Sequence, residues 1–305
     1  MTDEQLFDEF IKITNFSFPI KKRPYRKELI NWIEKYNSSI KNSFIISDVT
    51  KTKIVNFGEK LIQSYDLHKT SYEQSFKCFC ELMDENNEIF PFAYLGQREI
   101  YMCLNESYYR ISTMELDYEN MLHKPYPPTS SPTRFCSKKY AISYMSTSPL
   151  VCWYELGKPE MFYCAKYNVI NYDKRTQKLL RLDINPVSAH NEIRRLICNH
   201  EDVLPYIKKY LFIFPLIAAC SFVEQSREKD EYIIPSLLME WIGESSDYLG
   251  IRYYSDSLYK AAHKKWDHNI ALIGRNPNLN GISNDLISIF EVKKDGIVKP
   301  KTLYF

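Results

Sequence analysis

The stretch Tyr140–Glu155, YAISYMSTSPLVCWYE, decides how the fold is predicted. It opens with a short apolar run that contains tyrosines, which predicts a strand over Tyr140–Met145. Ser148 can serve as an N-cap and Pro149 occupies the first helical position, so we expect a helix that begins there and runs through Glu155. The stretch therefore predicts a strand that leads directly into a helix.

The same kinds of pattern continue toward the C-terminus. We expect strands at residues 161–170, 250–254 and 269–273, and helices near 189–198, 203–223 and 235–242. These elements follow one another without a regular strand-helix-strand alternation. The predicted fold class is therefore α+β, rather than a doubly wound parallel sheet.

The N-terminal part of the chain has a different character. Up to about residue 90 the apolar residues recur at helical spacing with few glycines, whereas Ile89–Tyr94 and Glu99–Leu104 are short apolar runs that suit strands. We therefore predict a helical N-terminal region over residues 1–90 and a second domain over residues 91–305. Inside that domain, the proline-rich stretch Lys124–Arg134 predicts a loop.

Charge and hydrophobicity limit the kinds of partner. The chain has 40 Lys and Arg residues against 38 Asp and Glu residues, so we expect no large field of one sign and no nucleic-acid partner. The most apolar stretch, Tyr210–Val223, contains Pro215 and is shorter than the about 20 residues of a membrane span, which predicts a buried helix and no membrane association. The N-terminus lacks a secretory pattern and 8 cysteines are scattered along the chain, which favours reduced thiols in a cytoplasmic protein.

Several common catalytic motifs are absent from the sequence. It contains no G-x-x-x-x-G-K-[ST], G-x-G-x-x-G, G-x-S-x-G or H-E-x-x-H, so the usual triphosphatase, dehydrogenase, hydrolase and zincin interpretations lose support. The tightest groups of metal-binding side chains are Cys78-x-Cys80 and Cys198-x-His200, and neither has a second pair at the spacing of a structural zinc site. We expect no metal, and interpret the cysteines as small buried apolar side chains.

Arg110 is the first candidate for chemistry. In a strand, alternation directs Arg110 to the same face as Tyr108 and Ser112. An arginine on an interior face requires an anion, and a pyrophosphate suits its planar fork. The alternative is a surface arginine at the end of a strand.

Glu155 and Ser255 are the other two candidates. Glu155 shares one helical face with Val151 and Cys152, and could hold ribose hydroxyls or stabilise positive charge at an anomeric carbon. The alternative is a solvated glutamate late in a helix. Ser255 directly follows the strand of residues 250–254, whose tyrosines could stack on a planar ring, although loop serines are common.

Taken in order, these segments resemble the RES domain, a family named for its arginine, glutamate and serine. The resemblance covers about residues 105–275 and rests on five matching segments: Tyr109-Arg110-Ile111, Arg134-Phe135, Tyr144–Glu155, Tyr232–Pro235 and Gly250–Ser255. The chain departs from the family pattern at Cys136–Lys139, where an asparagine and a glycine are usual. The resemblance implies that this segment is the loop under the nicotinamide or the phosphates.

The resemblance implies an ADP-ribosyltransferase-like mixed β core with NAD+ as the substrate. Arg110 would bind the pyrophosphate, Glu155 would hold the ribose next to nicotinamide, and Ser255 would orient that ribose or Glu155. Tyr144 would pack against a ring. The other residues that the resemblance implies for binding NAD+ are Arg134, Phe135 and Tyr254.

The function that the resemblance implies is cleavage of the nicotinamide-ribose bond, by an NAD+ glycohydrolase or phosphorylase that acts as a bacterial toxin or anti-phage defence effector. Two alternatives stay open: a mono-ADP-ribosyltransferase that modifies a protein, and a non-enzymatic nucleotide-binding module. Because uncontrolled loss of NAD+ is toxic, we expect restraint by a small antitoxin or by the N-terminal helices. Whether the chain forms a homo-oligomer is open. The short basic runs Lys208-Lys209 and His263–Lys265 are typical of solvated faces rather than of a nucleic-acid site.

Overall fold

The chain divides into two compact units. The computed structural model describes residues 2–16, 24–95, 107–124, 133–171, 177–221, 229–244, 247–254 and 268–298. The first unit joins Met1–Pro91 to Ile184–Trp241, and the second joins Phe92–Asp183 to Ile242–Phe305. The predicted change of character near residue 90 coincides with a unit boundary, but residues 184–241 belong with the N-terminal helices rather than with the second unit.

The first unit is helical. Its helices are α1 (Asp3–Thr14), α2 (Tyr25–Asn42), α3 (Asp48–His68), α4 (Tyr72–Asp84), α7 (Pro186–Cys198), α8 (Leu204–Ser221) and most of α9 (Ile233–Glu244), with short 3-10 turns η1 (Asn87–Ile89) and η2 (Asp230–Tyr232). Helices α1, α3 and α4 begin at N-capping residues. The side chains of Thr2, Ser47 and Ser71 each accept a hydrogen bond from a backbone N–H in the first turn. The structure confirms the helices predicted before residue 90 and those predicted between residues 189 and 242.

Helix α8 explains why a late segment joins the N-terminal helices. From Tyr210 to Cys220 every residue of α8 is buried. By length and composition alone α8 could cross a membrane, yet 67% of it is buried inside the protein, as is typical of a core helix. Its apolar surface is covered within the first unit by helices that include α2 and α3.

Pro215 lies inside α8 and leaves one carbonyl without its helical partner. Proline has no N–H, so the carbonyl of Leu211, four residues earlier, cannot make the usual helical hydrogen bond. The buried hydroxyl of Tyr36 in α2 donates to that carbonyl at 2.5 Å instead. This bond links α2 to α8 at the point where the proline interrupts the helix.

Tyr36→Phe is therefore expected to lower the free energy of unfolding by about 1–3 kcal/mol, because the buried Leu211 carbonyl loses its donor. Urea unfolding followed by far-ultraviolet circular dichroism measures the change. A loss under about 0.5 kcal/mol, the usual size of a neutral surface change, would contradict this role of the hydroxyl.

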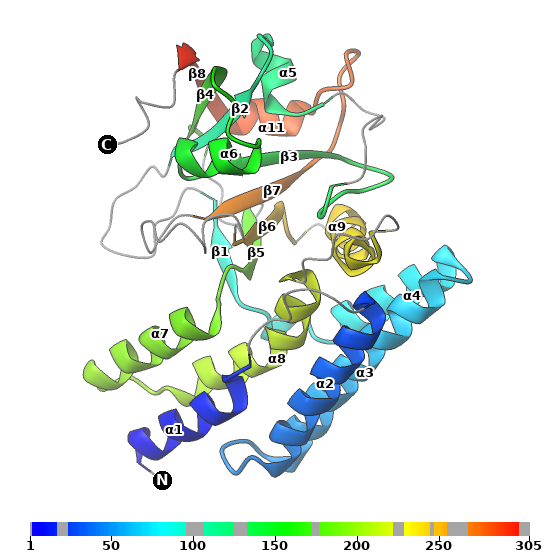
Figure 1. The fold of residues 1–305 in the computed structure, drawn as a ribbon, viewed down its shortest axis with the longest axis vertical. Helices are drawn as coiled ribbons and strands as arrows, with labels where there is room; N and C mark the ends of the chain where they lie inside the picture. Colours follow the sequence, from blue (N-terminus) through cyan, green and yellow to red (C-terminus); the bar gives the residue numbers. More distant parts are fainter. Residues whose placement is uncertain are drawn as a thin grey trace. The chain divides into compact units, whose positions relative to one another are not determined.

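The second unit is built on one mixed sheet of eight strands among the described residues (Figure 1). The strands lie in the order β1-β5-β6-β7-β3-β2-β4-β8. Their bounds are β1 (Phe92–Tyr94), β2 (Ser107–Ser112), β3 (Ala141–Ser146), β4 (Phe162–Val169), β5 (Lys178–Leu182), β6 (Gly250–Tyr253), β7 (Asn269–Gly274) and β8 (Phe290–Val298). Strands β5 and β6 are parallel and the other neighbours are antiparallel. Together with the helices, this sheet confirms the predicted α+β class.

Each face of the sheet has its own helices. Helices α5 (Tyr118–Leu122) and α11 (Asn284–Ile289) contribute Leu122 and Leu286 to a large apolar cluster with Met145 and Leu272 of the sheet. Helix α6 (Pro149–Glu155) covers the opposite face, where Cys152 and Trp153 pack against a smaller cluster that contains Ile111. The strand at 141–146 and the helix through Glu155 confirm the predictions from the opening stretch.

The sheet is weakly joined between β2 and β3. Among the described residues these strands are paired at the single position Tyr109 and Ser146, whereas β2 pairs with β4 along its whole length and β3 does so with β7. The carbonyl of Leu122 at the end of α5 bridges the two strands, since it accepts from Arg110 Nη1 of β2 and, at 2.6 Å, from Ser143 Oγ of β3. Beside Arg110 the two strands are therefore joined through α5 rather than by backbone pairing.

Candidate active site

Arg110 directly follows Tyr109, the position at which β2 pairs with β3. It is half-buried, on the same face as Tyr108, as the strand alternation predicts. Burial lowers the pKa of Arg110, and the nearby Tyr167, Cys152 and Tyr144 raise it in part. Within the described ranges, no ion pair joins its guanidinium to a carboxylate. A desolvated guanidinium of this kind favours an anionic ligand.

Glu155 is the last residue of α6, and local sequence determines where that helix stops. Gly157 follows with φ +84°, and Lys158 N–H donates back to the Trp153 carbonyl at 2.9 Å, which is a glycine-terminated helix end. At the other end Pro149 occupies the first turn as predicted, although the Ser148 side chain makes no capping hydrogen bond. The Glu155 side chain is exposed at this fixed end of the helix.

A buried asparagine holds the Glu155 carboxylate. Asn269 Nδ2, on β7, donates to Glu155 Oε1 at 2.6 Å. Asn269 is opposite Tyr253 of β6 and Ser146 of β3 in the antiparallel registers, so these side chains share one face of the sheet. Tyr144 lies on that face as well, because it is paired with Ala271, two residues along β7. We call Tyr144, Glu155, Tyr253 and Asn269 the Glu155 cluster.

The Arg134-Phe135 turn is fastened to this cluster. Tyr144 OH donates to the Phe135 carbonyl and lies 2.6 Å from Thr133 Oγ1. The Phe135 ring packs on Tyr253, with 4.6 Å between the ring centroids. Burial raises the pKa of the Tyr253 hydroxyl well above its usual value, Glu155 and Tyr144 raise it further, and Arg134 lowers it. Arg134 and Phe135 are therefore near the carboxylate.

The predicted residues fall into two groups. Tyr144, Glu155, Arg134 and Phe135 come together, whereas the register between Tyr109 and Ser146 directs Arg110 to the opposite face. Both groups act on the Cys152 thiol, since Glu155 raises its pKa and Arg110 lowers it. Tyr254 is half-buried directly after β6, and Ser255 lies outside the described residues.

The cluster also contains two residues that the sequence did not single out. Tyr253 is the last residue of β6 and is paired with Asn269, whereas the chosen Tyr254 follows the strand. Asn269 is the first residue of β7, whose other side chains are apolar. A polar residue at the start of an apolar strand is the feature of the sequence that could have identified it. Its role depends on contact with Glu155, which lies 114 positions away in the chain.

The segment Gly250–Tyr253 supplies the cluster with a rigid support. A Cβ on Gly250 would lie 2.1 Å from the backbone oxygen of Ala271, so only glycine permits this approach of β6 to β7. Arg252 Nε lies 2.7 Å from Asp183 Oδ2, and Arg181 Nε lies 3.0 Å from the other carboxylate oxygen. The Asp183 side chain is only 5% exposed, so this is a buried ion triad behind Tyr253.

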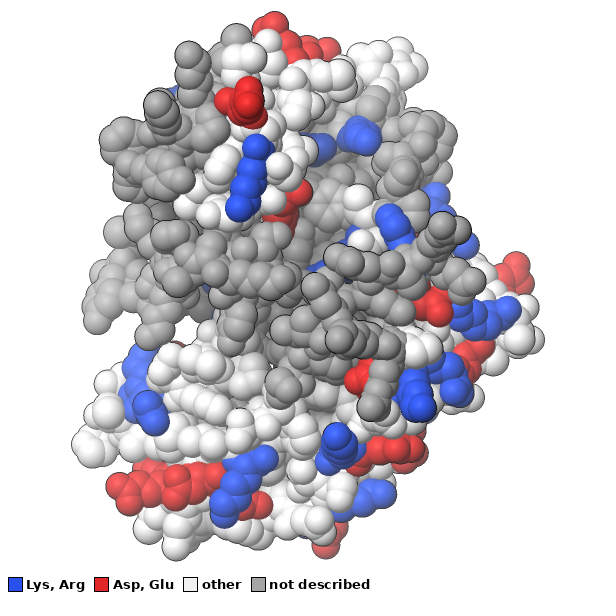
Figure 2. Space-filling view, in the orientation of Figure 1, with Lys and Arg blue, Asp and Glu red and all other residues white. Residues whose placement is uncertain are grey.

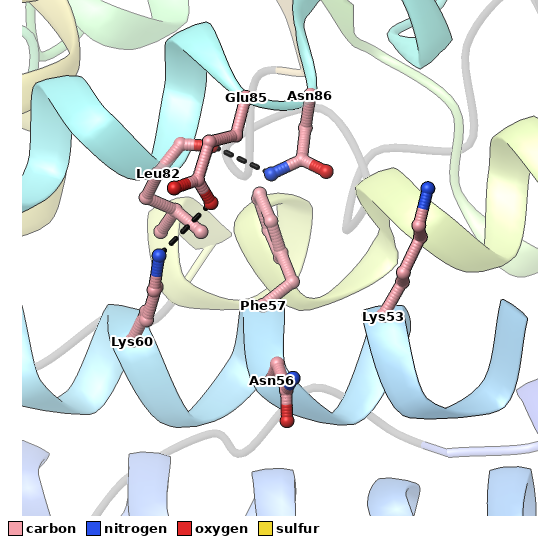
Figure 3. Close-up of a pocket in the computed structure, with 7 residues that line it drawn as sticks. All are labelled: Lys53, Asn56, Phe57, Lys60, Leu82, Glu85 and Asn86. Atoms are coloured by element: carbon pink, nitrogen blue, oxygen red, sulfur yellow. Dashed lines mark hydrogen bonds and ion pairs between the residues drawn. The ribbon is translucent and has the colours of Figure 1, made fainter. Parts of the chain in front are cut away.

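The first unit has a pocket of its own (Figure 3). It measures about 290 Å³ between α3 and α4, and Lys60 Nζ lies 2.9 Å from Glu85 Oε2 at its edge. Its lining residues are Lys53, Asn56, Phe57, Lys60, Leu82, Glu85 and Asn86. None of the residues predicted to bind NAD+ lines this pocket.

Neither the charges on the face drawn in Figure 2 nor the metal-binding side chains of the described residues indicate a further site. Basic and acidic side chains of the described residues are interspersed on the face shown in Figure 2. Within the part of the chain that the structure describes, no group of three His, Cys, Asp or Glu side chains could hold a metal ion.

Comparisons with known proteins give one distant relative of direct interest. No family model and no solved structure matches the chain. Among curated proteins it is similar to "Putative toxin YopC" of Bacillus subtilis (strain 168), with 25% identity over 225 residues. The match covers 68% of this chain and 50% of the relative, so the chain spans about half the length of the protein it matches. The chain is thus distantly related to a protein that is named as a toxin.

Proposed function

We propose that this chain is a toxin that consumes NAD+ by cleaving the bond between nicotinamide and ribose. One observation carries the proposal: the exposed Glu155 carboxylate is held at 2.6 Å by the buried amide of Asn269, beside the rings of Tyr144 and Tyr253. A carboxylate fixed beside aromatic rings suits a planar, positively charged ring attached to a sugar.

The chemistry requires little from the protein beyond this arrangement. The C–N bond breaks with its electron pair leaving on nicotinamide, which departs neutral, and positive charge develops on the ribose. Glu155 stabilises that charge more than it stabilises the ground state, and so lowers the barrier. Water or inorganic phosphate then adds to the ribose carbon, and water releases its proton to solvent. Tyr144 and Tyr253 would pack against the nicotinamide.

Arg110 would bind the pyrophosphate. Its guanidinium is half-buried and within the described ranges has no carboxylate partner, so an anion would compensate a charge that burial disfavours. Its guanidinium donates to the Leu122 carbonyl at the end of α5, while Glu155 lies on the other face of the sheet. An NAD+ molecule bound by both side chains would therefore have to contact both faces of the sheet.

The resemblance to the RES domain supports cleavage of NAD+, and the distant similarity to "Putative toxin YopC" supports the role as a toxin. NAD+ is abundant in the cytoplasm, so a toxin of this kind would act there. Restraint by an antitoxin would protect the producing cell.

Incubation of the purified protein with NAD+ tests the proposal. We expect release of nicotinamide, and a dependence of the other product on added inorganic phosphate would separate a phosphorylase from a glycohydrolase. Labelling of a protein by ADP-ribose would identify a transferase instead. If no nicotinamide is released while NAD+ or ADP-ribose still raises the melting temperature, the chain is a nucleotide-binding module and the proposed cleavage is wrong.

A further inference from the structure

Asn269 is the least expected member of the Glu155 cluster. It is 1% exposed at the start of β7, in a strand whose other side chains are apolar. An asparagine there must be desolvated, which is unfavourable unless its polar atoms find partners. Its Nδ2 has a partner in Glu155 Oε1 at 2.6 Å.

The chemistry of this contact fixes the orientation of the amide. An ionised carboxylate only accepts hydrogen bonds, so the atom that faces it must be the N–H-bearing nitrogen. The opposite atom, Asn269 Oδ1, is then a buried acceptor, and it has no hydrogen-bond partner among the described residues. A purely structural amide would be expected to satisfy both of its polar atoms.

We infer that Asn269 is the positioning residue for Glu155 in the cleavage of NAD+, an assignment that rests on the proposed function. Its amide holds Glu155 Oε1, and its Oδ1 is a buried acceptor next to the same carboxylate. Because Asn269 is anchored in the sheet and Glu155 ends a short helix, the hydrogen bond fixes the carboxylate against the tyrosine rings.

Asn269→Asp tests this inference through its pH profile. The introduced carboxylate would face Glu155 at hydrogen-bond distance, and two such groups cannot both be ionised without strong repulsion. At low pH the introduced group carries a proton and can donate to Glu155 as the amide does. We therefore expect nicotinamide release to fall roughly tenfold or more at pH 7.5 and to recover as the pH falls, so that the optimum moves about one unit lower than in the wild type.

Among the described residues, Glu155 acts on the ionisable groups of Tyr253 and Cys152, and Tyr144 and Arg134 act on Tyr253 in turn; all four are unchanged in this variant. Asn280→Asp provides the matched control, because Asn280 is exposed in the same unit. Its profile is expected to follow that of the wild type. A profile of Asn269→Asp that also follows the wild type would overturn the inference and leave the proposed function intact.

Melting temperatures separate failure of this inference from failure of the proposed function. If the wild type releases no nicotinamide, the proposed function is wrong, and the contact between Asn269 and Glu155 is tested by stability alone. The melting temperature of Asn269→Asp should fall further below that of the wild type as the pH rises from about 4 to 8. The pKa of the two neighbouring carboxyl groups is raised in the folded state, so their ionisation at higher pH lowers stability. A deficit that does not change with pH overturns the inference. Should Asn269→Asp not fold, Asn269→Ala must lower kcat at least about tenfold with KM within about threefold, or the inference is wrong.

Discussion

Replacing Glu155 with glutamine is expected to lower nicotinamide release from NAD+ by about 10²- to 10³-fold, the usual cost of removing one group that stabilises charge in a transition state. Glutamine has nearly the same shape and keeps an oxygen that can accept from Asn269 Nδ2, so the contact at 2.6 Å can survive. Only the negative charge beside the developing ribose cation is lost. The rate of nicotinamide release at saturating NAD+ measures the effect.

Glu291→Gln is the matched control for this substitution. Glu291 is exposed on β8 in the same unit, and its removal should leave the rate unchanged. Equal melting temperatures of wild type and Glu155→Gln would show that the loss does not come from unfolding. A Glu155→Gln variant that releases nicotinamide as fast as wild type would remove the carboxylate from the mechanism.

Asp183→Asn is expected to lower the free energy of unfolding by about 3–5 kcal/mol, because it leaves two arginines beside a buried neutral group. The Asp183 carboxylate lies 2.7 Å from Arg252 Nε and 3.0 Å from Arg181 Nε. Burial by itself raises the pKa of Asp183, but the charges of Arg181 and Arg252, helped by His268, outweigh burial and hold it far below its usual range. Urea unfolding at pH 7 measures the difference.

Asp66→Asn is the matched control, because it removes the charge of an aspartate whose ion pair is not buried. Asp66 is paired with Arg26 at 2.7 Å, but their side chains are 39% and 54% exposed, so we expect less than about 1 kcal/mol. Equal losses in the free energy of unfolding for the two substitutions would contradict the role of burial.

The Asp183 contribution also has a definite pH dependence. Its folded pKa is depressed, so the stabilisation is fully present above the unfolded value of about 3.9 and is lost as the pH falls below it toward the folded pKa. The gap between wild type and Asp183→Asn should therefore narrow below about pH 4. A gap that stays constant down to pH 2.5 would contradict this linkage.

The helix that carries Glu155 could be predicted because its boundaries are local. Pro149 favours the first helical turn and Gly157 adopts a left-handed conformation just past the end, and neither effect needs a distant partner. The same holds for the strand at Ala141–Ser146, whose pattern of short apolar runs is visible in a few residues.

The sequence did not show in the same way that residues 184–241 belong to the helical first unit. The apolar pattern of α8 predicts that it is buried, but it does not say which helices bury it. The hydroxyl of Tyr36 reaches the carbonyl of Leu211 across 175 positions of sequence. Such a contact depends on which helices pack together. The hydrophobic effect is not directional, so an apolar pattern does not specify the partner helix.

The sequence by itself determined the α+β class, the helical character of the first 90 residues and the strand and helix that lead to Glu155. Only the tertiary structure decided that Asn269 holds Glu155, that Tyr253 shares a face of the sheet with Asn269, and that Arg110 lies on the opposite face. The reason is register: pairing along β6, β7, β3 and β2 assigns each side chain to a face, and a shift of one residue would reverse that assignment.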